Sequence, residues 1–280
     1  WLGSNSGYDY RGWQLTYLLM GGLMSLGVIT TLFCHEPVID IAAQNEQQAE
    51  RKAQLIARGW SSSLAGLGAW TYEAIWCPFA DFFRRYGTSA LLILGLIACY
   101  RISDVVMGVM SNSFYVDLQF SKTEVATITK VYGVIMTLVG AALGGVLVMR
   151  FGTLRILFLG AVLTASTNLL FALLNEVGHN LELLTLIISL DNLSAGIATA
   201  AFVTYLSSLT NVAFSATQYA LFSSIMLLLP KLLAGFSGRV VEQIGYSHFF
   251  IGTSLLGIPV MILIIMVAKR GSTLSPQTHK

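Results

Sequence analysis

Seven long apolar stretches dominate this sequence and restrict what the chain can fold into. A helix rises about 1.5 Å per residue, so about twenty mostly apolar residues are needed to cross roughly 30 Å of hydrocarbon. The sequence therefore predicts an all-α, polytopic membrane helix bundle with about seven transmembrane helices. The expected spans are residues 13–33, 88–115, 127–149, 154–174, 181–209, 215–237 and 248–268.

Composition agrees with a chain whose main solvent is lipid. Hydrophobic residues make up 55% of the sequence and charged residues only 11%, whereas a soluble globular chain carries roughly a quarter charged residues. The formal net charge is +2, so the overall charge balance does not indicate a nucleic-acid partner. Cys34, Cys77 and Cys99 are too few and too scattered for a disulfide framework or a metal cluster, and we interpret them as apolar filling.

One long segment, residues 35–86, interrupts the apolar pattern between the first two spans. A polar run, "AAQNEQQAERKAQLIAR", is followed by the aromatic stretch "WSSSLAGLGAWTYEAIWCPFADFFRRYG". Glu73, three serines and Pro78 make this stretch poorly suited to a crossing. We therefore expect a solvent-side linker in which residues 60–79 form an interfacial amphipathic helix, with Arg84 and Arg85 facing anionic lipid.

Lysines and arginines at the ends of the spans predict the orientation, because cytoplasmic loops carry an excess of them. One side collects Arg51, Lys52, Arg58, Arg84, Arg85, Arg150, Arg155, Lys269 and Arg270, and the other mainly Arg11, Lys122 and Arg239. The first side is expected to be cytoplasmic, together with the tail at residues 271–280. The chain starts with a tryptophan and has no signal-like segment, so we expect it to begin part-way through a longer protein.

Small residues within the spans predict close helix packing. The run "GAALGG" places Gly140 and Gly144 four residues apart, as it does Ala141 and Gly145, and "SAGIATAA" at residues 194–201 offers a second small surface. Backbones can approach closely along such surfaces. Small residues are common in membrane helices, so by themselves they indicate packing and not transport.

Charged residues inside the spans are the candidate functional residues. Such a residue at a helix centre costs about 2.5 to 3.5 kcal/mol on insertion scales, so it usually faces a partner or a water-filled cavity. Arg101 and Asp104 share a helix face, where they can pair with each other or flank a common ligand. The other candidates are Lys130 in the third span, Asp191 with its neighbour Asn192 in the fifth, and Lys231 after Pro230 in the sixth. Together they favour a cavity that attracts anions.

Each candidate also has a purely structural interpretation. Arg101 and Asp104 can form an architectural ion pair, and Lys130 can extend to the outer interface. Asp191 can have an architectural role, and Lys231 can bond the carbonyl that loses its donor at Pro230. These alternatives stay open at the level of sequence.

The sequence offers no arrangement typical of an enzyme. His35, His179, His248 and His279 fall in expected loops or at span ends, and no His/Cys/Glu cluster has the spacing of metal ligands. No Ser/His/Asp set lies at a common depth. We therefore expect no enzymatic activity, cofactor or metal, and a structural membrane module is the alternative outside transport.

Five sequence blocks carry a resemblance to a known family: "PFADFFRRYG", "YRISDVVMG", "ITKVYGVIMTLVGAALGGVLVMRFGTLRILFLG", "SLDNLSAGIATAAFVTYLSSLTN" and "FSATQYALFSS". They resemble the AmpG-type muropeptide permeases of the major facilitator superfamily, over nearly the whole chain. The resemblance implies the sixth to twelfth helices of a transporter. Residues 1–34 would hold the last helix of the amino-terminal half, 35–86 the cytoplasmic linker and 87–270 the carboxyl-terminal six-helix half, which would act with the missing half of the same chain.

The resemblance also implies a cytoplasmic signature loop in "GGVLVMRFGTLR". Gly145, Arg150, Gly152 and Arg155 match the superfamily pattern, but Met149 stands where many members have an aspartate. This departure puts a gating ion pair at that position in doubt.

Positions in the seventh and tenth helices of the family match the candidate charges. Arg101 and Asp104 reproduce a basic residue three positions before an aspartate, and Asp191 stands where relatives tend to have a glutamate before asparagine. The implied function is proton-driven import of anhydromuropeptides across the bacterial inner membrane. Arg101 and Lys231 would attract the anionic cargo while Asp104 or Asp191 takes up a proton. The alternative is a major facilitator carrier for another anionic solute, such as a peptide or an acyl-coenzyme A.

Overall fold

The computed structural model describes residues 10–33, 41–211 and 214–271, in which no strand occurs. Contacts divide the chain into two units, residues 1–47 and 48–280, each described by itself. The first unit contains α1 (Tyr10–Phe33) and the beginning of α2 (Ile41–Ala57). The expected all-α fold is confirmed for these residues, whereas His35, His279 and nearly all of the expected tail lie outside them.

Seven helical segments of the described chain are long and apolar enough to cross a membrane, as the sequence predicts. They are Tyr10–Phe33, Ser89–Asp117, Lys122–Phe151, Thr153–Val177, Leu181–Leu209, Ser215–Ala234 and Ser237–Arg270. The third begins five residues earlier than expected because a capping box starts it there. The Ser121 hydroxyl accepts a hydrogen bond from the Glu124 N–H, and the Glu124 carboxylate accepts one from the Ser121 N–H.

The seventh span includes residues that we expected to form a polar link. α12 (Ser237–Leu255) contains all of "GRVVEQIGYSH" and departs from helical geometry only at Gly245, whose φ is +77°. Glycine adopts this left-handed conformation without steric cost, so the helix can kink there. α13 (Gly257–Gly271) follows almost directly. The residues between the sixth and seventh expected spans are therefore helical on both sides of a kink at Gly245.

The linker is largely helical where the structure describes it. After α2, the helix α3 (Ser62–Thr71), a π-helical turn η1 (Tyr72–Trp76) and α4 (Cys77–Tyr86) follow one another without a break. Gly68 of α3 faces the Leu55 side chain of α2. The helix expected at residues 60–79 is thus part of a longer helical run, and its place at a membrane interface stays a prediction.

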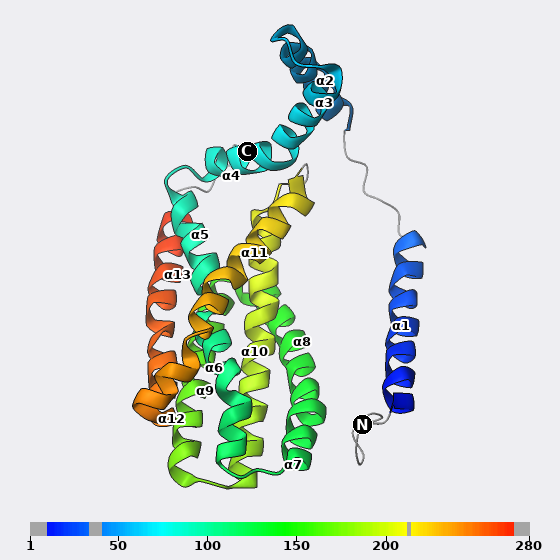
Figure 1. The fold of residues 1–280 in the computed structure, drawn as a ribbon. Coiled ribbons are helices and arrows are strands. Elements are labelled where there is room, and N and C mark those ends of the chain that lie inside the picture. The colour runs from blue at the N-terminus through cyan, green and yellow to red at the C-terminus, as the bar shows by residue number, and fades with distance from the viewer. Residues whose placement is uncertain (1–9, 34–40, 212–213, 272–280) are drawn as a thin grey trace. The chain divides into compact units, whose positions relative to one another are not determined.

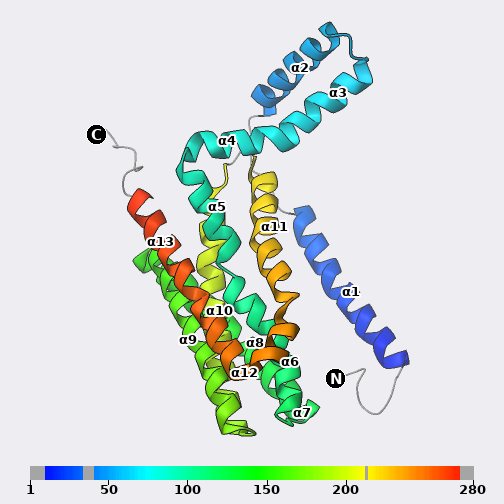
Figure 2. The same ribbon diagram turned by 60° about the vertical axis from the view of Figure 1, so that its left-hand side comes forward.

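The remaining helices form one bundle (Figure 1). They are α5 (Ser89–Cys99), α6 (Ile102–Asp117), α7 (Lys122–Ala126), the π-helical turn η2 (Thr127–Tyr132), α8 (Gly133–Phe151), α9 (Thr153–Val177), α10 (Leu181–Leu209), α11 (Ser215–Ala234), α12 and α13. α10 packs between α8 and α9, α9 also contacts α12 and α13, and α11 packs on α5 and α6. α4 lies across the end of the bundle where α5 and α11 begin (Figure 2), and we call this the linker end.

Glycines allow the close contact of α8 with α10. A Cβ atom on Gly140 would overlap the Leu193 carbonyl oxygen, and one on Gly144 would lie 2.9 Å from the Ile197 Cα. On the facing helix, a Cβ on Gly196 would overlap the Thr137 carbonyl. The packing predicted from "GAALGG" is confirmed for these positions, whereas Gly145 faces open space.

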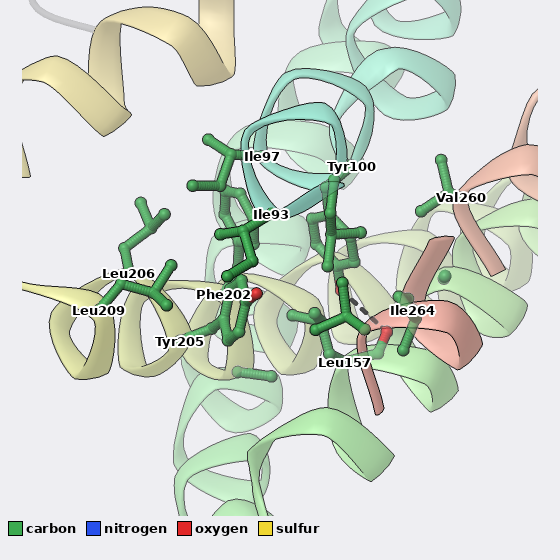
Figure 3. Close-up of a cluster of buried hydrophobic side chains, with 14 of the residues drawn as sticks. Ile93, Ile97, Tyr100, Leu157, Phe202, Tyr205, Leu206, Leu209, Val260 and Ile264 are labelled. Atoms are coloured by element: carbon green, nitrogen blue, oxygen red, sulfur yellow. Dashed lines mark hydrogen bonds between the residues drawn. The ribbon is translucent and has the colours of Figure 1, made fainter. Parts of the chain in front are cut away.

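Buried apolar side chains form two clusters. The first lies toward the linker end and includes Phe82, Leu157 and Phe222. Within it the rings of Tyr100 and Phe202 stack with centroids 4.5 Å apart, and the Tyr100 hydroxyl donates to the Leu157 carbonyl at 3.2 Å (Figure 3). The second includes Phe114, Phe171 and Phe250, whose rings pack edge to face or tilted.

Candidate functional site

Polar side chains lie at or next to the junction of the two apolar clusters. Along α10, Ile188 belongs to the second cluster and Ile197 to the first, with Asp191 and Asn192 between them. We call this set the polar layer. Its members are Arg101, Ser103, Asp104, Thr137, Thr167, Asn168, Asp191, Asn192, Thr199 and Thr253.

Arg101 and Asp104 form an ion pair at a break in the first span of the bundle. α5 ends at Cys99 and α6 starts at Ile102, so Arg101 has non-helical dihedral angles. Its Nη2 atom lies 2.9 Å from Asp104 Oδ2, and its Nη1 donates to Thr199 Oγ1 of α10 at 2.8 Å. Both charged side chains keep 25% of their surface exposed. Arg101 Nε is buried and has no hydrogen-bond partner in the described residues, so the pair has capacity for a further acceptor.

Asp191 is the member of the polar layer that α10 contributes opposite Thr167 of α9. Its carboxylate accepts a hydrogen bond of 3.0 Å from Thr167 of α9, and it lies near enough to Asp104 for the two carboxylates to interact electrostatically. The structure records no ion pair for Asp191 among its described residues. Two carboxylates and one guanidinium therefore share this region.

Asn192 joins α10 to α8. Its carbonyl oxygen accepts from Thr137 at 3.0 Å, and its amide donates to the Ile188 carbonyl. The side chain lies against Gly133, so α8 and α10 are linked here by polar contacts as well as by the glycine packing. The structure thus supports an architectural contribution from Asn192.

Sequence reasoning missed a buried polar triad that includes Ser103, the residue before Asp104. Asn168 of α9 donates to Ser103 at 2.9 Å and to Thr253 at 3.3 Å, and Ser103 donates to the Thr253 carbonyl. All three are at most 4% exposed. The available signal was an asparagine in the middle of an apolar span, which needs a partner because its amide is costly to bury unpaired.

The two candidate lysines do not join these contacts. Lys130 is exposed and lies in η2, eight residues after the start of its helical segment. Lys231 is also exposed, and α11 continues past Pro230 to Ala234. Neither lysine has an ion pair or a side-chain hydrogen bond within the described ranges, so the structure gives no support to a bond from Lys231 to the carbonyl freed at Pro230.

The expected signature loop is a single residue. Gly145 and Arg150 belong to α8 and Arg155 to α9, and only Gly152, with φ of +88°, lies between the helices. A positive φ favours glycine, which explains that position physically. The two arginines are exposed at the linker end.

A second polar cluster, which we call the latch, fastens α4 to the bundle. Gln218 of α11 is fully buried; its amide nitrogen donates to the Pro78 carbonyl and to Asp81, and its oxygen accepts from Arg85 and from the Asn211 N–H. Arg85 also pairs with Asp81 at 2.9 Å. The latch joins two of the motifs quoted above, "PFADFFRRYG" and "FSATQYALFSS".

Neither cluster has the composition of a metal site. No group of three or more His, Cys, Asp or Glu side chains that could hold a metal ion occurs in the part of the chain that the structure describes. The polar layer can instead bind an anion at Arg101 and exchange a proton at a carboxylate.

Comparisons with known proteins agree with this arrangement. The putative transporter AmpG 4 of Rickettsia felis is 30% identical over 260 residues, which cover 93% of this chain and 58% of that protein. The anhydromuropeptide permease of Escherichia coli is 29% identical over 258 residues, 92% of this chain and 47% of the permease. The chain resembles AmpG-type permeases over most of its length. The putative transporter AmpG 1 of Rickettsia bellii is 31% identical over 180 residues, 64% of this chain and 44% of that protein.

The matched region is only part of each AmpG-type relative. The chain spans about half the length of the curated relatives it matches. No family model matches it. The three AmpG-type relatives are named as transporters or permeases and not as enzymes, and a membrane helix bundle is the expected architecture for such proteins.

Proposed function

We propose that this chain is the carboxyl-terminal part of a secondary transporter that imports anhydromuropeptides together with protons across the bacterial inner membrane. The name of the Escherichia coli relative supports this cargo. The observation that carries the proposal is the Arg101–Asp104 pair, held with Thr199 at a helix break inside an apolar bundle and still partly exposed. Because both side chains keep a quarter of their surface exposed and Arg101 Nε has no hydrogen-bond partner among the described residues, the pair can take a further acceptor.

In this mechanism Arg101 binds a carboxylate of the cargo, because a guanidinium fork matches carboxylate geometry. The cargo then competes with Asp104 for Arg101, and Asp104 or Asp191 takes up a proton. Neutralising one carboxylate removes the repulsion between the two and changes the relative stability of the inward-open and outward-open states. The lysines Lys130 and Lys231 would raise the local concentration of anions.

The linker end is proposed to face the cytoplasm. Arg84, Arg85, Arg150 and Arg155 lie at this end, and cytoplasmic ends of spans are enriched in such residues. The chain acts together with an amino-terminal half, since transport by this architecture requires two halves around a central site.

Uptake by the full-length protein tests the proposal. Membrane vesicles containing the protein should accumulate labelled anhydromuropeptide, and a protonophore should collapse the accumulation. Asp191→Asn should lower the initial rate at least about tenfold, since loss of a general acid–base group typically costs that much or more. The matched control is Asp117→Asn, an exposed carboxylate that accepts a hydrogen bond from Tyr246, and it should transport normally. Normal accumulation by Asp191→Asn at equal protein levels would remove that residue from the mechanism.

A carrier for a different anionic solute is the second candidate, because Arg101 would also bind the carboxylate of a peptide or the phosphate of an acyl-coenzyme A. Competition decides between them: a tenfold excess of unlabelled peptide or acyl-coenzyme A should leave muropeptide uptake unchanged if the first proposal is right.

A further inference from the structure

A pocket at the linker end has no assigned role in the proposed transport cycle. It has a volume of about 310 Å³ and lies between α5, α9, α10 and α13, away from the polar layer. Two arginines, Arg85 and Arg270, contribute to its lining. Four aliphatic side chains, Leu92, Ile93, Leu154 and Val267, contribute the apolar part.

Tyr205 supplies a buried polar group to this pocket. Its side chain points from α10 toward Ile93 of α5 (Figure 3), and the residue is only 5% exposed. The Tyr205 hydroxyl is buried and has no hydrogen-bond partner among the described residues. An unpaired buried hydroxyl is costly, so a ligand acceptor here would gain a full hydrogen bond.

Tyr86 adds a second hydroxyl to the same lining. Burial raises the pKa of the Tyr86 hydroxyl above its usual value, so the group stays protonated near neutral pH and can donate. The pocket thus combines two phenolic donors and two guanidinium groups with an aliphatic wall.

We propose that this pocket binds the phosphate headgroup of an anionic phospholipid, with the glycerol and the first acyl methylenes against the aliphatic wall. Arginine is well suited to phosphate because its planar fork can make two parallel hydrogen bonds. Arg270 ends the seventh span and Arg85 lies four residues before the second, which is near the depth at which headgroup phosphates are found. The volume lies in the range of small-molecule sites. The same chemistry would also fit a soluble phosphate ester, which the test separates from lipid.

A bound headgroup would be coupled to the latch. Arg85 lines the pocket and also donates to Gln218 and to Asp81. A phosphate beside Arg85 would fix the guanidinium in place and so strengthen the attachment of α4 to the bundle. Lipid composition would then influence how firmly the linker is held, independently of the cargo.

Native mass spectrometry of the full-length protein in detergent tests the proposal, with phosphatidylglycerol and phosphatidylethanolamine as probes. Wild type should retain phosphatidylglycerol in preference to phosphatidylethanolamine. Arg270→Gln and Tyr205→Phe should each weaken retention about tenfold, since each removes a hydrogen bond to a charged group. Lys269→Gln, which makes the same change in net charge one residue away, should retain the lipid as wild type does.

Leu154→Trp gives an independent test because it fills the pocket without altering charge; it should abolish retention while the melting temperature stays within a few degrees of wild type. Equal retention of the two lipids, or unchanged retention in both Arg270→Gln and Leu154→Trp, would overturn the proposal. Displacement of the lipid by glycerol phosphate at concentrations no higher than the lipid's own would show that the ligand is a soluble phosphate ester and that the lipid assignment is wrong.

Discussion

Arg101 shows how one side chain can be stabilised in an apolar bundle and still have a donor available for a further hydrogen-bond acceptor. Its two terminal nitrogens are occupied by Asp104 and Thr199, while Nε has no partner among the described residues. A guanidinium in this state can exchange one acceptor for another without leaving its position. That property distinguishes a binding site from a fixed structural ion pair.

A double-mutant comparison separates architecture from transport at this pair. Arg101→Ala leaves the Asp104 carboxylate without its cation and should lower the unfolding free energy by about 1–3 kcal/mol, less than for a fully buried pair. The double variant Arg101→Ala/Asp104→Ala should recover most of that loss, because no unpaired charge remains. Uptake should be lost in both variants if Arg101 binds cargo. Thermal melting in detergent and vesicle uptake are the two measurements, and recovery of uptake in the double variant would assign the pair a purely structural role.

At the level of helices, two contacts place the functional residues. The glycine contact between α8 and α10 brings Asn192 to Thr137, and the latch holds α4 beside the beginning of α11. Each depends on a side-chain volume or a hydrogen-bond pattern that few other residues provide. Each therefore gives a sharp mutational test.

Gly196→Ala should destabilise the bundle, because the new methyl group would overlap the Thr137 carbonyl of α8. Overpacking of this kind typically costs about 1–3 kcal/mol. Gly145→Ala is the matched control: it makes the same change on α8 where the structure has open space. Melting curves of the two variants should differ, with only Gly196→Ala shifted down, and equal melting temperatures would contradict the observed helix contact.

Gln218→Glu should release α4 although the two side chains have almost the same shape. The substitution removes both donors to Pro78 and Asp81 and places a second carboxylate beside Asp81. We expect a loss of about 1–3 kcal/mol in the stability of this region, since the Pro78 carbonyl and Asp81 lose their donor and two carboxylates then share Arg85. Faster amide hydrogen exchange across residues 77–86 would report it. Gln54→Glu, at an exposed position of α2, should leave the exchange of α4 unchanged.

For the whole molecule, the central feature is a polar layer between two apolar clusters. The clusters anchor both ends of the spans, so the polar layer in between is held by hydrogen bonds that can rearrange. In the proposed alternating access, in which two halves rock about a fixed position, this layer would supply the central site.

Orientation is the testable prediction at this scale. After replacement of the native cysteines, a cysteine at Arg150 should react with a membrane-impermeant thiol reagent only in permeabilised cells. A cysteine at His179, near the opposite end of α9, should react in intact cells. The reverse pattern would show that the linker end faces the periplasm.

Much of the fold follows from the sequence because membrane insertion is governed by local properties. Segment length and hydropathy determined the seven spans, and a bilayer leaves the backbone little alternative to helix. Local caps and kinks were harder to predict from the sequence. The helix start at Ser121 and the kink at Gly245 depend on individual hydrogen bonds and dihedral angles, which average hydropathy does not capture.

The candidate site was predicted in part. Charges in apolar spans pointed to Arg101, Asp104, Asp191 and the two lysines, because burial makes each of them costly wherever it lies. The partners could not be foreseen, since Thr199 is 98 residues away from Arg101 along the chain, and only helix packing decides which face meets which. The same reason applies to Gln218, whose four hydrogen bonds join distant segments.

The sequence by itself thus determined the helical class, the spans and the identity of the costly charges, because those depend on composition within a single helix. The tertiary structure alone decided that Arg101 reaches Thr199 of α10, that Lys130 and Lys231 form no ion pair within the described residues, and that α4 is latched to the bundle. Those outcomes depend on distances between helices, which are fixed by glycine contacts and by buried polar groups that must all find partners.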